Sequence, residues 1–182
     1  MGRADRAISS MASGVNRQPI TLGIDPGTAR TGYGLVNESD RGIVAIAYGV
    51  LTTPADWSLP RRMQSLHEQL QELIALHGPS TAAVEKLFFQ KNVRTAMSVG
   101  QARGVILLAL AEAGLEVSEY SPREVKLAVA GYGAADKRQI QDMVRCLLGL
   151  AQRPEPDDAA DALAIAICHL HSSQLLRLAG ER

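Results

Sequence analysis

The chain has 182 residues, of which 46% are apolar, 21% charged and 4% aromatic, and its formal net charge is zero. This length fits one domain with a full hydrophobic core and is too short for two ordinary domains. The composition argues against disorder or a coiled coil over most of the chain, and the zero net charge counts mildly against a surface that grips nucleic acid everywhere.

The first 18 residues contain several charged side chains and no apolar run, so we expect a flexible tail at 1–18 rather than a signal peptide or membrane anchor. The two cysteines, Cys146 and Cys168, lie in apolar helical stretches without ligand or redox spacing. We therefore expect two buried thiols in a reducing cytoplasm.

Three strands are predicted in succession at 20–25, 32–37 and 43–53, which indicates an antiparallel meander. A helix follows, because apolar residues recur at helical spacing from Leu59 to Ile74 and Gly78-Pro79 supplies a stop. A fourth strand is predicted at 81–85 and a second helix at 93–113. In that helix Gly100 and Gly104 share one face, where they either permit close packing or are merely tolerated.

The last part of the chain predicts a strand at 115–120, a short helix opened by Ser121-Pro122, and helices at 135–148 and 157–176. This order indicates an α/β fold, a mixed five-stranded sheet flanked by helices of the ribonuclease H-like kind. We expect one nuclease domain at 19–176, followed by a tail at 177–182. In such a sheet the first and fourth strands are neighbours, which would bring Asp25 and Glu85 together.

Four carboxylates, Asp25, Glu85, Asp158 and Asp161, lie beside or inside apolar runs, where a charge needs a partner. Three have an ordinary alternative: a turn for Asp25, an ion pair for Glu85, and helix capping for Asp158 in the first helical turn. Asp161 is harder to explain in this way, because it lies in an otherwise apolar run. Carboxylates from several elements are also the ligands that hard divalent cations prefer, and such cations promote attack on phosphorus. The combination therefore suggests a metal-dependent phosphodiesterase.

The ordered motifs GIDPGTARTGYG, VEKLFFQKN, GQARG and DDAADALAIAICH resemble the RuvC family of Holliday junction resolvases over about residues 20–171. The resemblance implies a homodimeric crossover junction endodeoxyribonuclease that nicks two opposed strands of a four-way DNA junction in recombination and repair. It also implies one or two Mg²⁺ ions per subunit, replaceable by Mn²⁺, and a branch-migration motor of the RuvA–RuvB type as a partner.

By motif, the same resemblance assigns metal binding and catalysis to Asp25, Glu85, Asp158 and Asp161. It places Lys126 and Lys137 near the scissile phosphate. It also suggests the DNA-contacting residues Phe88, which would act at the junction centre, and Lys91, Arg94 and Arg103, which would contact the backbone. Charge alone leaves open whether the acid-free segment 86–103 is a basic face or a set of solvated side chains.

Two other functions compete with this interpretation. An actin-like ATPase or sugar kinase also begins with a Gly-Ile-Asp-x-Gly-Thr loop, but it requires two such domains and this chain has the length of one. A non-catalytic junction-binding module is the other alternative. Four intact carboxylates weigh against it, because they would repel phosphates without serving catalysis.

Overall fold

The computed structural model of this chain has a mixed sheet with flanking helices. It describes residues 19–40, 42–87 and 93–180. The predicted tail at 1–18 and two predicted DNA contacts, Phe88 and Lys91, lie outside these residues. The described elements are β1 (Ile20–Asp25), β2 (Arg30–Ser39), β3 (Gly42–Thr52), α1 (Leu59–His77), β4 (Thr81–Glu85), α2 (Val93–Glu112), β5 (Glu116–Tyr120), α3 (Pro122–Ala130), α4 (Lys137–Leu147) and α5 (Asp157–Gly180).

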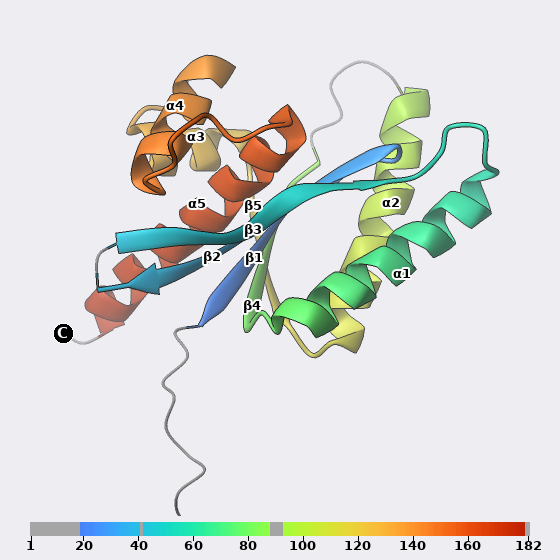
Figure 1. Cartoon of the computed structure of the whole chain (residues 1–182), viewed down its shortest axis with the longest axis horizontal. Coiled ribbons are helices and arrows are strands. Elements are labelled where there is room, and N and C mark those ends of the chain that lie inside the picture. Colours follow the sequence, from blue (N-terminus) through green and yellow to red (C-terminus); the bar gives the residue numbers. More distant parts are fainter. Residues whose placement is uncertain (1–18, 41, 88–92, 181–182) are drawn as a thin grey trace, which may run out of the picture.

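The five strands lie in the order β3-β2-β1-β4-β5 (Figure 1). β1, β2 and β3 form the predicted antiparallel meander, whereas β4 pairs parallel to β1 and β5 parallel to β4. Because β1 and β4 are parallel neighbours with Ile24 opposite Val84, the residues that follow, Asp25 and Glu85, end the two strands side by side. The predicted fold class and the adjacency of the first and fourth strands are confirmed.

Helices cover both faces of the sheet. On one face α1 and α2 pack over Leu22, Ile24 and Leu35, and on the other α5, α3 and α4 pack over Val36 and Ala83 (Figure 1). Neighbouring residues such as Leu35 and Val36 therefore enter different cores, as the period of two in a strand requires.

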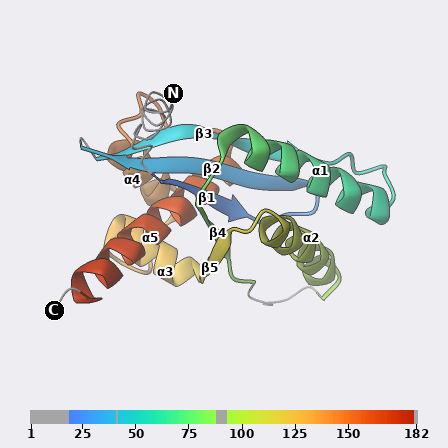
Figure 2. The ribbon, with the colours of Figure 1, turned by 90° about the horizontal axis from the view of Figure 1, so that it is seen from below.

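Glycines let α5 lie directly on the sheet, which it crosses in Figure 2. A Cβ atom added to Gly23 would lie 2.2 Å from the carbonyl oxygen of Ala162, and one added to Gly32 would lie 2.0 Å from that of Asp158. Side chains at these two positions would push α5 off β1 and β2. The close approach holds the first turns of α5, with their acids, at the carboxyl end of β1.

Two sequence predictions need correction. Cys146 is exposed, whereas Cys168 is buried as expected. On the amphipathic helix α4, Ile140 and Val144 face the core, which turns Cys146 two residues later toward solvent. α5 also continues to Gly180, so residues 177–180 of the predicted tail are helical. By length and composition α5 is the one described helix that could cross a membrane, but half of its most apolar window is buried, as in a core helix.

Candidate active site

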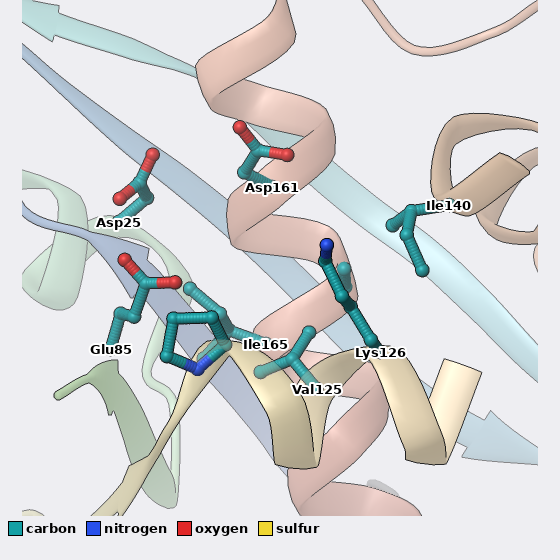
Figure 3. A pocket seen from close by; sticks show the side chains of 9 residues that line it. Asp25, Glu85, Val125, Lys126, Ile140, Asp161 and Ile165 are labelled. Carbon is teal, nitrogen blue, oxygen red and sulfur yellow. The ribbon is translucent and has the colours of Figure 1, made fainter. Parts of the chain in front are cut away.

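Three of the four predicted carboxylates line one cavity of about 110 Å³ (Figure 3). Asp25 ends β1, Glu85 ends β4, and Asp161 projects from the second turn of α5. Lys126 of α3 extends its ammonium group into the same space. The remaining lining is mostly apolar, from Pro122, Val125, Ile140, Ala164 and Ile165. An apolar wall around charged groups lowers the local dielectric and strengthens their interactions.

The three acids destabilise one another's charged forms. Burial is the largest influence on Asp25, and the neighbouring carboxylates add to it, so the pKa of Asp25 rises from 3.8 to about 8. Burial and the charge of Asp161 raise the pKa of Glu85. Burial also raises the pKa of Asp161, although the ammonium of Lys137 acts in the opposite direction. The site therefore holds more negative charge than its own cations neutralise.

Lys137 lies at the first residue of α4, where the capping box of Asp136 and Gln139 begins the helix. Its Nζ atom is 3.2 Å from Oδ2 of Asp161 and 3.1 Å from Oδ2 of Asp157. Burial lowers the pKa of Lys137, but hydrogen bonds to the two aspartates outweigh it, so the pKa is raised. Asp157 is also held by Gln141, whose Nε2 donates to it at 2.8 Å. These contacts join the beginning of α4 to the beginning of α5.

Asp158, the fourth predicted acid, faces a different part of the surface. Its Oδ2 accepts a hydrogen bond of 2.7 Å from Nε of Arg30, at the first residue of β2. Both residues line an open groove of about 790 Å³ together with Lys137, Glu155, Pro156 and Asp157. Sequence reasoning missed Arg30. The signal available was its position in the same GIDPGTARTGYG segment as Asp25.

A divalent metal fits the chemistry of this donor set. As the side chains stand, no three His, Cys, Asp or Glu residues in the described ranges form a ready metal-binding cluster. Instead Arg30 holds Asp158, and Lys137 holds Asp161 and Asp157. Asp25, however, lies near three other carboxylates, which add to the effect of burial in raising its pKa, and a hard cation would relieve both the burial of its charge and the repulsion. Oxygen donors from β1, β4 and α5 suit such an ion.

The other predicted residues lie away from this cavity or cannot be placed. Arg103 forms an ion pair with Glu119 of β5 and is mostly buried, and Arg94 lies in the first turn of α2, where side chains are not described. Two histidines near the last acids in sequence serve packing: His169 Nδ1 is 3.0 Å from the Tyr120 hydroxyl, and His171 Nδ1 is 3.1 Å from the Ala128 carbonyl.

Comparisons with known proteins agree on one family. The family model described as "Crossover junction endodeoxyribonuclease RuvC" matches residues 21–169. A curated protein of that name from Chloroflexus aggregans is 59% identical over 160 residues, which are 87% of this chain and 97% of the relative. The structure of Thermus thermophilus RuvC has a TM-score of 0.80 at 35% identity and covers 86% of this chain and 96% of its own. The same Thermus thermophilus protein in complex with a Holliday junction substrate has a TM-score of 0.79 at 33% identity, with the same coverage.

Proposed function

Because this chain belongs to the RuvC family of crossover junction endodeoxyribonucleases, we propose that it resolves four-way DNA junctions by nicking two opposed strands, in recombination and repair. The observation that carries the proposal is the cavity that gathers Asp25, Glu85 and Asp161 from three separate elements, with a lysine beside them. Such a site suits hydrolysis of a phosphodiester, and its described lining residues include no Ser, Thr, Tyr or Cys that could serve as a hydroxyl or thiol nucleophile.

The family is one of metal-dependent nucleases, and we propose Mg²⁺ as the metal, with Mn²⁺ as a substitute and one or two ions per subunit. Asp25, Glu85, Asp158 and Asp161 would hold it. When bound, such a metal supplies a Lewis acid and lowers the pKa of a bound water. The four carboxylates would orient the site around the phosphate, and a bound cation would favour the charged forms of Asp25, Glu85 and Asp161, whose pKa values burial raises.

The two lysines supply positive charge from two different helices. Lys126 reaches into the cavity from α3, and Lys137 reaches toward it from α4. Phosphate hydrolysis builds negative charge on the phosphoryl and leaving oxygens, which fixed ammonium groups stabilise. We assign both lysines to the stabilisation of that charge.

DNA contacts outside the cavity remain part of the proposal. Phe88 would stack at the junction centre and Lys91 would contact the backbone, both in the segment that follows Glu85. Arg94 lies in the first turn of α2, and Arg103, nine residues later on the same helix, would have to leave Glu119 to reach a phosphate. These assignments rest on the family's motifs.

A homodimer would be formed through α2. Met97 and Leu108 are 64% and 53% exposed, and a Cβ at Gly104 would meet nothing within 4 Å. Gly104 lies seven positions after Met97 and four before Leu108, which places all three residues on one face of the helix. Gly104 and Leu108 also line a groove shared with α1. An exposed apolar face of this kind favours association with a second copy.

The cellular setting follows from the same family membership. We propose a cytoplasmic enzyme with a single nuclease domain at 19–176, to which a branch-migration motor of the RuvA–RuvB type delivers junctions.

The proposal is tested by strand cleavage of a labelled synthetic four-way junction beside a linear duplex of the same sequence. The native protein and Asp158→Asn are compared with Mg²⁺, with Mn²⁺ and with a chelator. Paired, metal-dependent nicks only in the junction, lost in the variant, are expected. Junction binding without cleavage in either metal would instead identify a structure-specific DNA binder.

A further inference from the structure

The ion pair between Arg30 and Asp158 blocks an acid that the proposed function requires. Nε of Arg30 donates to Oδ2 of Asp158 at 2.7 Å, so one carboxylate oxygen already has a cationic partner. The pair is held from both sides. Arg30 begins β2, where its backbone pairs with Thr52, and the neighbouring Gly32 lies in backbone contact with Asp158.

Arg30 differs from Lys137, the other cation on the α5 acids. Lys137 contacts both Asp157 and Asp161, so it keeps a partner if Asp161 turns to another ligand. Among the described residues, Asp158 is the one ion-pair partner of Arg30. A cation that binds Asp158 would therefore leave the Arg30 guanidinium without its ion pair, with Asp157 as a more distant acidic neighbour.

The released guanidinium would face an open groove. The Arg30 side chain is 52% exposed and lines this groove of about 790 Å³, in which Lys137 is the other cation and Glu155 and Asp157 are acids. A planar guanidinium matches a phosphate oxygen pair better than an ammonium does. In the metal-free protein, a DNA strand that enters the groove beside the cavity would meet the Arg30 guanidinium paired with Asp158. After a metal binds Asp158, the strand would meet the guanidinium as a free cation.

We propose that Arg30 is an internal counter-ion that competes with the metal for Asp158 and, once displaced, contacts a DNA phosphate. Metal binding and DNA binding are then coupled through one side chain. The inference rests on the proposed function because it takes Asp158 as a metal ligand. When only a fraction of the molecules can bind metal, the apparent Kd equals the intrinsic Kd divided by that fraction.

The exposure of the ion pair sets how strongly Arg30 competes with the metal for Asp158. Solvent screens a half-exposed ion pair, so the paired form is favoured only modestly. Removal of the Arg30 charge should therefore tighten metal binding by about two- to five-fold. Loss of a merely structural contact would do the opposite, because a disordered Asp158 binds metal less well.

The first test is calorimetric titration of the DNA-free full chain with Mn²⁺. Arg30→Gln should lower the apparent Kd by about two- to five-fold, and Arg30→Lys should lower it by less. Arg177→Gln removes the same charge from the far part of α5, about 28 Å along the helix from Asp158, and should leave the Kd unchanged.

The second test measures junction binding at several salt concentrations, in chelator and in saturating Ca²⁺. For the native protein, the salt dependence of junction affinity should indicate about one more released ion with saturating metal than with chelator. Arg30→Gln should show no such increase. Equal or weaker Mn²⁺ binding by Arg30→Gln, or an unchanged increment, overturns the inference while the proposed function stands. Absence of any Mn²⁺ binding by the native protein would remove the proposed function itself.

Discussion

Gly32 of β2 and Asp158 of α5 are in backbone contact, and a Cβ on the glycine would lie 2.0 Å from the aspartate's carbonyl oxygen. The contact joins the early part of one strand to the first turn of a helix 126 residues later in the chain. It fixes how far α5 stands from β2, where Gly32 is paired with Asp25 of β1. The separation of the α5 acids from Asp25 therefore depends on a residue that carries no functional group.

Gly32→Ala should displace α5 from the sheet, because both atoms in the clash belong to rigid elements. Overpacking of this kind costs about 1–3 kcal/mol, and we expect the upper end of that range. Thermal unfolding followed by circular dichroism measures the loss, and junction cleavage should fall with it. Gly180→Ala, at a position with nothing within 4 Å of the added Cβ, is the control and should be neutral. A native-like melting temperature for Gly32→Ala would contradict this account of the helix position.

Metal-free protein should lose stability as pH rises, because the pKa of Asp25 is about 8 in the folded state and 3.8 ordinarily. Between these values the folded state holds a proton that the unfolded state has lost, so the free energy of unfolding falls. From pH 5 to pH 8 the loss attributable to Asp25 is up to about 4 kcal/mol. Asp25→Asn should remove most of this slope and be more stable than the native protein at pH 8.5 in chelator.

A control of opposite sign is available for that experiment. The hydrogen bond from Arg153 lowers the pKa of Asp142, so its charged form stabilises the fold above the ordinary pKa and loses this effect only in acid. Asp142→Asn should leave the slope between pH 5 and pH 8 unchanged. An equal slope in native protein and Asp25→Asn would show that Asp25 is already charged at neutral pH.

Added Mn²⁺ should raise the melting temperature, because it compensates the excess negative charge around Asp25. At a hundred times the Kd the gain is about 2.7 kcal/mol, which corresponds to about 5–10 °C for a domain of this size. Asp161→Asn should reduce the shift, and Asp142→Asn should retain it. Differential scanning fluorimetry against metal concentration measures the effect, and a flat response at millimolar metal would argue against a shared site.

Lys126→Met should lower the rate of cleavage and leave junction affinity nearly unchanged, because its ammonium extends into the cavity rather than over the surface. One preorganised charge donor in a catalytic site contributes about a hundred-fold to the rate. Single-turnover cleavage at saturating enzyme measures the rate separately from binding. Lys86→Met is the matched control, since Lys86 pairs with Glu124 and does not line the cavity.

Leu108→Glu should convert a dimer to a monomer, because a charge on the exposed apolar face of α2 cannot be buried against a second copy. Analytical ultracentrifugation measures the mass. Leu175→Glu places the same charge on the equally apolar end of α5, where Leu175 is 68% exposed, and should leave the dimer intact. Leu175 lines a cavity of about 550 Å³ together with Leu127 of α3 and Leu178 of α5. Dissociation by Leu175→Glu alone would move the interface to that cavity.

Local sequence patterns by themselves determined the order and type of most elements of this protein. The short apolar runs in 20–25 and 81–85, the helical spacing from Leu59 to Ile74 and the Gly78 stop all reappear as observed elements, because each depends on neighbours within a few residues. Those signals give the element order and hence the mixed sheet. They also place Asp25 and Glu85 at the ends of adjacent parallel strands.

Only the tertiary structure decided how the acids of α5 meet the rest of the site. Asp158 was expected to share the metal site with Asp161, yet it pairs with Arg30 and faces a groove, while Lys137 holds Asp161. These pairings join residues more than a hundred positions apart or on separate helices, and no local pattern encodes them. They depend on how closely a helix packs against a sheet, which the glycines of β1 and β2 set through steric contact rather than through any chemistry visible in sequence.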